Sequence, residues 1–297
     1  MTSRPIIVPA GYDRSVRVIE EMRTFTPFGL RLWDFALDTP ISDGLIVTAR
    51  PHAGGRQITA RVNRSGIFVI ADVPELWDHE HPEPDEDVTT ATTITYAVRI
   101  IDPRGRFLTA GFTAELPHLG VYPGAGSLAP INGEPIDDPG FPMFSAPTRT
   151  TPPGFAAVRA RLVDEATGRP AAHAVVRIDV AGHSWFGVSG ADGQVVILFP
   201  FPTFDQPPAT GPPRAGGIPP TDQAFDATVA VRYAQLAADP WLGVPTFDSI
   251  RNQGAGRIRA TVGDTTVATI PTRIEFGREL VLATQNQDMT VLLIEAA

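Results

Sequence analysis

Apolar and polar residues alternate with a period of two in several stretches near the middle of the chain. Residues 158–162 and 176–180 have an aliphatic side chain at every second position and charged residues between them, which is the pattern of strands with one buried face. Between these stretches, residues 164–170 contain a glycine and a proline that favour a reversal of the chain. Residues 190–193 begin and end with glycine and precede the apolar run 195–199, so they indicate a hairpin. The pattern predicts a small antiparallel β-sandwich.

A similar order of strands and turns occurs 130 residues earlier in the chain. Within residues 30–40, five of eleven positions are identical to their counterparts in 160–170. The identical pairs are Arg31 and Arg161, Leu32 and Leu162, Asp34 and Asp164, Ala36 and Ala166, and Pro40 and Pro170. Residues 63–66 then correspond to 190–193 after a gap of three residues, and each copy ends in an apolar run followed by a proline. We therefore predict a duplicated sandwich, with chance similarity between strand segments as the alternative.

The sequence divides into five segments, and its 27 glycines and 30 prolines leave few stretches that allow a helix of three turns. The fold class is therefore expected to be all-β. We predict a lead-in over residues 1–28, a first sandwich over 29–117, a linker over 118–154, and a second, larger sandwich over 155–297 with a proline-rich insertion at 202–220. The linker carries fourteen prolines or glycines in 37 residues, which makes it a poor strand or helix former. We expect the two sandwiches to be separable folding units.

Composition narrows the classes of function. The chain has no cysteine, which excludes disulfides and thiolate sites, and all 24 of its basic residues are arginine, which excludes lysine chemistry. The net charge of −9 argues against nucleic-acid or anionic-membrane binding. No run near the N-terminus predicts a signal peptide or transmembrane helix. We expect synthesis in the bacterial cytoplasm, with later membrane attachment or release in a particle left open.

Catalytic motifs are missing from the sequence. Neither Ser127 nor Ser189 has the spacing G-x-S-x-G, and no HExxH, GxGxxG, phosphate loop or EF-hand occurs. Asp34 and Asp164 could pair as catalytic carboxylates, but each precedes a turn in which aspartate accepts local backbone hydrogen bonds. The histidines at 52, 118, 173 and 183 stand singly, without partner spacing. We therefore predict no catalytic residue, no cofactor and no enzymatic activity.

Two other groups of residues could bind ligands. His79 and His81 lie in an acidic loop and are suitable ligands for a divalent metal, although two prolines favour a solvated acidic loop, and we predict no metal site. Trp185 and Trp241 could stack on sugars, with core or corner packing as the alternative.

The motifs also carry resemblances to known families. The strand, the turn D-x-x-T-G-x-P, the second strand and the A-D-G hairpin resemble the carboxypeptidase regulatory-like, or transthyretin-like, β-sandwich. The phrases N-R-S-G-I-F-V at 63–69, D-x-x-G-R-F-L at 102–108 and F-G-R-E-L-V-L at 276–282 are similar to proteins encoded with phage-tail-like contractile injection systems. The resemblance implies a structural or accessory part of such a particle, for example of its baseplate.

We therefore expect a non-enzymatic protein that acts through contacts with other protein subunits, without nucleic acid or membrane insertion and with its oligomeric state left open. The alternative is a carbohydrate-binding or adhesive module. The two Pro/Gly-rich segments and the last strand, if it lies at an exposed sheet edge, are the expected contacts. The candidate interface residues are Phe141, Phe144, Phe201, Phe204, Met289, Val291 and Leu293.

Overall fold

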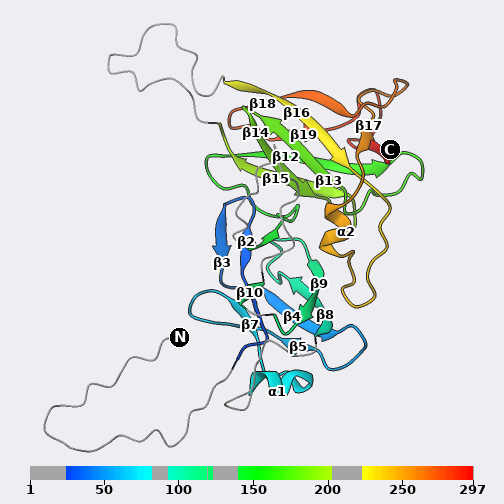
Figure 1. Ribbon diagram of the computed structural model, residues 1–297. Coiled ribbons are helices and arrows are strands. Elements are labelled where there is room, and N and C mark those ends of the chain that lie inside the picture. Colours follow the sequence, from blue (N-terminus) through cyan, green and yellow to red (C-terminus); the bar gives the residue numbers. More distant parts are fainter. Residues whose placement is uncertain (1–24, 82–92, 119, 123–139, 203–222, 297) are drawn as a thin grey trace, which may run out of the picture.

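A computed structural model describes residues 25–81, 93–118, 120–122, 140–202 and 223–296. The prediction of an all-β protein is confirmed (Figure 1). The helices in this part of the chain are single turns, namely η1 (Pro74–Leu76), α1 (Trp77–Glu80) and α2 (Phe247–Arg251). Residues 1–24 of the lead-in and residues 203–220 of the proline-rich insertion lie outside the described residues.

The first sandwich consists of one four-stranded sheet that faces two sheets built from shorter strands. The first of these sheets has the order β5-β4-β8-β9, and the two sheets of shorter strands have the orders β10-β1-β7-β6 and β11-β2-β3. The strands are β1 (Phe28–Leu30), β2 (Leu32–Asp34), β3 (Thr39–Ile41), β4 (Ile46–Pro51), β5 (Ile58–Thr59), β6 (Arg61–Val62), β7 (Phe68–Ile70), β8 (Ile94–Ile101), β9 (Ala110–Leu116), β10 (Val121–Tyr122) and β11 (Phe141–Met143).

The second sandwich has the same plan with longer strands. One sheet has the order β14-β13-β16-β18, and the other has the order β15-β12-β20-β17, with β19 also paired to β12. The strands are β12 (Phe155–Asp164), β13 (Val175–Val180), β14 (His183–Val188), β15 (Gln194–Pro200), β16 (Ala224–Arg232), β17 (Gly256–Ile258), β18 (Thr269–Glu275), β19 (Leu280–Leu282) and β20 (Leu292–Ala296).

The two sandwiches repeat each other in strand register, which supports the predicted duplication. Gly29 of β1 pairs with an antiparallel strand at Val69 and a parallel strand at Val121. Its counterpart 130 positions later, Arg159 of β12, pairs in the same two ways with Val196 and Val281. Two equivalent leucines follow the same rule: Leu32 pairs with the parallel strand β11, and Leu162 pairs with the parallel strand β20. The identities found in the sequence therefore fall at equivalent positions of one topology.

The turn after β2 is also repeated after β12. Trp33 pairs with Pro40, and Val163 pairs with Pro170, again at an offset of 130. Both turns use a left-handed residue at the same place, where Asp38 has φ 53° and Gly168 has φ 66°. Aspartate is one of the few non-glycine residues that adopt this conformation.

The predicted linker needs correction, because part of it is strand. β10 and β11 lie within residues 118–154, and they pair with β1 and β2 as members of the first sandwich. Pro142 does not interrupt β11, because the hydrogen bonds run from Phe141 N–H to the carbonyl oxygen of Arg31 and from Phe35 N–H to the carbonyl oxygen of Met143, on either side of β2. Pro142, between them, faces away from β2. Phe141 and Met143 are fully buried. The first sandwich therefore extends beyond residue 117.

The expectation of separable units also needs correction, because the hydrophobic core of the first sandwich includes residues from the second. The second sandwich has its own core between its two sheets. The core of the first sandwich continues into side chains of β13, β14 and α2. These side chains are Val175, Phe186, Val188, Phe247 and Ile250. Figure 1 shows the second sandwich stacked on one end of the first, and the shared core makes the two a single packed body.

Candidate functional site at the junction of the two sandwiches

Aromatic side chains from both sandwiches meet at the junction. Phe35 and Phe144 of the first sandwich have ring centroids 5.1 Å apart. Phe186 of β14 approaches Phe35 edge-on at 6.3 Å, and Phe247 of α2 lies 5.0 Å from Phe141 and 6.3 Å from Phe144. Such pairs contribute about 0.5–1.5 kcal/mol each beyond the area they bury. The junction is therefore an apolar interface and not a hinge.

The loop between β16 and α2, residues 234–246, extends from the second sandwich onto the outer face of the first; we call it the junction loop. Leu242 is fully buried, and its side chain lies so close to Gly111 that a Cβ at position 111 would be 2.9 Å from it. The guanidinium of Arg50 lies 3.9 Å from the ring centroid of Trp241, and His52 lies 3.7 Å from Asp239. Residues 240–243 thus form a packed corner, which agrees with corner packing as the alternative for Trp241.

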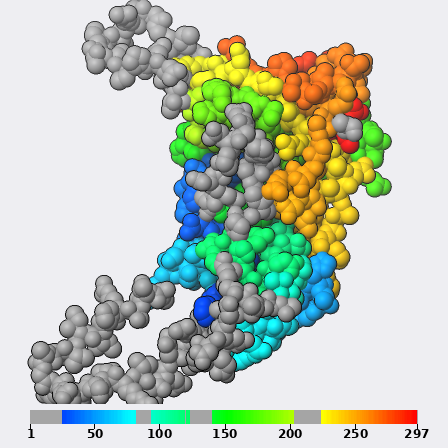
Figure 2. Space-filling model, in the orientation of Figure 1, coloured from blue at the N-terminus to red at the C-terminus, as the bar shows by residue number. Residues whose placement is uncertain are grey.

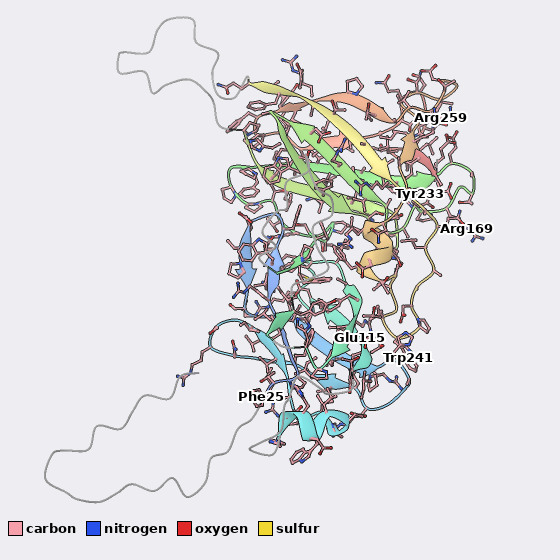
Figure 3. All side chains as sticks on the ribbon, viewed as in Figure 1. Phe25, Glu115, Arg169, Tyr233, Trp241 and Arg259 are labelled. Atoms are coloured by element: carbon pink, nitrogen blue, oxygen red, sulfur yellow. The ribbon has the colours of Figure 1, made fainter. Side chains whose placement is uncertain are left out.

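The figures show the same arrangement. In Figure 2 the yellow and orange atoms of the junction loop and α2 extend down the side of the first sandwich. Figure 3 shows Trp241 at the level of the first sandwich, whereas Tyr233, one residue before the loop, lies in the second.

A cavity of about 230 Å³ lies between the sandwiches. The first sandwich contributes residues 108–111 and Phe144, and the second contributes His173, residues 188–191, and part of the junction loop and α2. Most of these side chains are apolar. An apolar cavity with a few polar groups is the default candidate for a binding site, and this one is formed only where the two sandwiches meet.

His173 has the most reactive side chain in the cavity lining. Its backbone is left-handed, with φ 59°, a conformation that costs a non-glycine residue about 1–3 kcal/mol. Burial lowers the pKa of His173 below its usual value, so the imidazole is neutral at pH 7. Among the described residues, its ring nitrogens have no hydrogen-bond partner.

The side chain of Gln253 holds the backbone of His173 in this conformation. Gln253 is buried, and its Nε2 donates to the carbonyl oxygens of His173 at 2.8 Å and Ile250 at 3.0 Å. Its Oε1 accepts from the N–H of Ala234 at 2.7 Å. The N–H of His173 in turn donates to the carbonyl oxygen of Ser189 at 3.2 Å. The position of His173 is therefore determined from α2, the junction loop and the β14–β15 hairpin together.

Ser189 also lines the cavity, but its hydroxyl is used in the fold. The hydroxyl donates to the carbonyl oxygen of Ala171 at 2.7 Å and accepts from the N–H of Ala174 at 2.9 Å. Both partners belong to the segment before β13. Ser189 thus joins the hairpin to that segment and is not arranged as a nucleophile.

The structure places Asp34 and Asp164 in their own turns, as the structural alternative predicts. Asp34 accepts from the N–H groups of Ala36 and Leu37, and its carboxylate forms a bidentate pair with Arg149 at 2.5 and 2.9 Å. The side chains of Asp34 and Arg149 are only 6% and 9% exposed. Asp34 is therefore a buried structural acid.

Asp164 occupies the equivalent turn, where neutral donors replace the arginine. It accepts from Ala166 N–H at 3.0 Å, Thr167 Oγ1 at 3.0 Å, Gln235 Nε2 at 2.7 Å and Tyr233 Oη at 3.2 Å. Burial alone would raise the pKa of Asp164, but these hydrogen bonds lower it overall. Burial and the neighbouring Asp164 raise the pKa of Tyr233 to about 12. Gln235 thereby anchors the start of the junction loop to β12.

No group of three or more metal-binding side chains occurs in the part of the chain that the structure describes. His79 is 6% exposed, and neither ring nitrogen has a hydrogen-bond partner among these residues. His81 instead packs against Trp77, with ring centroids 4.1 Å apart and an interplanar angle of 54°. Glu80 accepts from the N–H groups of Asp72 and Val73. The remainder of the acidic loop, residues 82–92, lies outside the described residues.

Both candidate tryptophans pack against side chains of the protein itself. Trp185 stacks on Phe199 with ring centroids 5.5 Å apart and an interplanar angle of 13°. Trp241 packs under Arg50 in the junction loop. These contacts agree with the packing alternative and do not favour a sugar platform.

For three of the predicted interface residues the prediction is wrong, because their side chains are buried. Phe141 is 0% exposed, Phe144 is 7% exposed and Val291 is 3% exposed. All three are covered by the protein's own core or by neighbouring strands. The proline-rich composition around Phe141 and Phe144 suggests a linker, whereas these residues lie in and directly after the buried strand β11.

The other predicted interface residues differ in exposure. Met289 is 67% exposed, Leu293 is half-buried on β20, and Phe201 is half-buried against Phe276 with ring centroids 4.6 Å apart. Phe204 lies outside the described residues. The condition for the last strand to serve as a contact, an exposed sheet edge, is not met, because β20 lies between β12 and β17 and pairs with both.

Comparisons with known proteins leave the function open. No family model and no curated protein matches the chain. Among solved structures, the Bacillus anthracis TIE protein is 10% identical with a TM-score of 0.22, and the match covers 70% of this chain and 28% of that one. Shaft pilin SpaA from Lactobacillus rhamnosus GG is 9% identical with a TM-score of 0.22, and the match covers 93% and 98%. At these scores the likeness carries no argument about function. No helix among the described residues is long and apolar enough to cross a membrane.

Sequence reasoning did not find the cavity or its position at the junction. Its lining comes from segments more than 100 residues apart, and His173 has no local partner spacing.

Proposed function

We propose that this protein is a non-enzymatic subunit that acts through contacts with other proteins in a larger assembly. The observation that carries the proposal is the shared core at the junction, which joins the two sandwiches into one packed body. A packed body presents its surface residues at set distances from one another. This is the property that an assembly subunit needs, because preorganisation reduces the entropy lost on binding.

The use of the buried polar groups supports a structural role. The carboxylates of Asp34, Asp102 and Asp164 accept hydrogen bonds from their own turns, and the hydroxyl of Ser189 joins two segments of backbone. A nucleophile, a base and a group that orients the base are the usual parts of a hydrolytic site. These four buried groups supply none of those parts.

The finer proposal is that the assembly is a phage-tail-like contractile injection particle. The phrases at residues 63–69, 102–108 and 276–282 support it through their resemblance to proteins encoded with such systems. The protein would be made in the bacterial cytoplasm and incorporated into the particle there.

The end of the second sandwich offers exposed apolar side chains for such contacts. Met289 is 67% exposed and Val262 is 46% exposed. Their loops are joined by a hydrogen bond from the N–H of Val262 to the carbonyl oxygen of Gln285 at 3.1 Å. Exposed apolar side chains on neighbouring loops are candidates for an interaction surface. We propose Val262 and Met289 as contact residues.

Incorporation into particles tests the proposal. A tagged wild-type protein and the double variant Val262→Asp/Met289→Asp would be expressed in the native host, and their abundance in purified particles would be measured by mass spectrometry. The control is Val62→Asp, whose parent side chain is 43% exposed on the first sandwich. We expect the double variant to lose at least about tenfold in incorporation, because two buried, unpaired carboxylates oppose association. Circular dichroism would confirm that all variants are folded.

Two results would contradict the proposal. Absence of the wild-type protein from purified particles would remove the assembly role. Equal incorporation of the double variant and the control would remove Val262 and Met289 as contacts.

A further inference from the structure

The cavity at the junction has the volume of a small ring-shaped ligand. Its volume of about 230 Å³ exceeds that of an engineered cavity of about 150 Å³ that holds benzene. A fused pair of rings fits this volume better than a single ring does. Pockets that bind drug-sized ligands measure about 300–1,000 Å³, so a ligand of that size is too large for this cavity.

The lining selects for an uncharged ligand. Leu108, Phe144, Val188, Phe247 and Ile250 supply most of the wall. No aspartate, glutamate or arginine is among the described residues that line the cavity. Burial of an unpaired charge against such a wall is strongly unfavourable. A charged ligand would therefore lose more free energy of solvation than it would gain from contacts with the cavity wall.

His173 provides one polar contact at a defined place. A neutral imidazole has one N–H donor and one acceptor nitrogen, and neither is used within the described chain. The nearby hydroxyl of Ser189 is occupied by two backbone groups. The backbone strain at His173 is held by Gln253, and residues kept in strained conformations by their surroundings cluster at functional sites.

We propose that the junction cavity binds an uncharged bicyclic aromatic group with one polar edge atom, of the indole type, and that this atom hydrogen-bonds to His173. The group can belong to a free small molecule or to a tryptophan side chain of a partner protein. The inference goes beyond the proposed function, because it concerns a ligand and not the assembly. Since both sandwiches line the cavity, the bound ring would also strengthen the junction.

Titration of the full-length protein with indole tests the proposal. Isothermal titration calorimetry would measure the affinity, and the unfolding temperature would be followed with increasing indole. We expect saturable one-to-one binding and a rise in unfolding temperature, because a ligand that binds only the folded state stabilises it. Indole-3-carboxylate, which carries a charge, is expected to bind at least about tenfold more weakly.

Two variants locate the site. Ala191→Trp places a large side chain at an exposed position of the lining and is expected to abolish binding. His173→Gly removes the imidazole and relieves the left-handed strain, so it is expected to fold and to weaken binding about fivefold, the effect of one neutral hydrogen bond. Val281→Ala, at a half-exposed position outside the lining, is expected to bind as the wild type does.

The source of the ring is distinguished by a second titration with N-acetyl-tryptophanamide. Binding of this compound supports a partner side chain, and binding of indole alone supports a free small molecule. Failure of the wild-type protein to bind either compound at millimolar concentration would overturn the proposal, as would unchanged binding in Ala191→Trp. Neither result would alter incorporation into particles, so the two proposals fail separately.

Discussion

Replacement of Arg149 by alanine is expected to destabilise the protein strongly, because it leaves the buried carboxylate of Asp34 without its partner charge. The guanidinium of Arg149 contacts both carboxylate oxygens, at 2.5 and 2.9 Å, and also donates to the hydroxyl of Ser145 at 3.0 Å. The side chains of the pair are 9% and 6% exposed. Water therefore cannot take the place of the arginine without rearrangement of the turn.

The expected magnitude follows from burial. Removal of one partner from a buried ion pair costs about 3–5 kcal/mol. Asp34 keeps two backbone donors, from Ala36 and Leu37, so we expect a loss near the lower end, about 3 kcal/mol. The pair of Arg278 and Glu275 is a matched control, because its distance is also 2.5 Å but its side chains are 77% and 50% exposed. Arg278→Ala is expected to cost less than about 1 kcal/mol.

Urea denaturation followed by circular dichroism would measure the free energies of unfolding by linear extrapolation. A second variant separates charge from packing. In an Arg149→Ala background, Asp34→Asn removes the unpaired charge and is expected to restore at least about 1 kcal/mol. The reasoning is refuted if Arg149→Ala costs no more than Arg278→Ala, or if Asp34→Asn destabilises the Arg149→Ala protein further.

Three further predictions concern the junction, a hairpin and pH. Leu242→Ala is expected to cost about 3 kcal/mol in urea denaturation, because it empties a fully buried site on the first sandwich, whereas Val281→Ala, at a half-exposed site, is expected to stay within about 0.5 kcal/mol. Gly193→Ala is expected to cost at least about 2 kcal/mol more than Gly168→Ala: both sites are left-handed, but the added methyl meets the backbone of β12 only at Gly193. Burial alone would raise the pKa of Asp102, but hydrogen bonds from its turn and the charge of Arg106 lower it overall. The ionised carboxylate of Asp102 therefore stabilises the fold above the unfolded pKa of about 3.9, and this contribution is lost as pH falls through the lower folded pKa. Asp102→Asn is expected to flatten this part of the curve of stability against pH.

The turns and the repeat could be predicted from sequence because they depend on local chemistry. Asp34 and Asp164 accept hydrogen bonds from the residues that directly follow them. Gly193 supplies the positive φ that the hairpin needs. An identity at a constant offset then indicates the same turn twice, and the strand register agrees with that offset.

The junction could not be predicted, because it depends on contacts between distant segments. Phe144 and Phe247 stack across about a hundred residues of sequence. Arg149 pairs with Asp34 over 115 positions, and nothing in the local spacing of either residue indicates the partner. β11 could not be predicted for the same reason. Pro142 suggests a linker in the sequence, and only the pairing with β2 shows that the backbone of Pro142 faces away from the neighbouring strand, where no N–H donor is needed.

Prolines lie at four of the edges of the described sheets, where they oppose the addition of a further strand. Four strands at the ends of the described sheets, β3, β11, β15 and β18, each contain a proline. In β18 the N–H of Phe276 donates to the carbonyl oxygen of Gln223. Because backbone N–H groups along an antiparallel strand point alternately toward and away from the neighbouring strand, the backbone of Pro271, five residues earlier, faces away from β16.

The same holds in β15, where the bond from Phe201 to Gly154 makes Pro200 face away from β12. An added strand would meet a missing donor at each of these positions, which is how natural sheets resist edge pairing. The last strand, β20, has neighbours on both sides and offers no edge at all. Under the proposed assembly role, we therefore expect substitutions at exposed side chains such as Met289, and not at the proline-containing edges, to control incorporation.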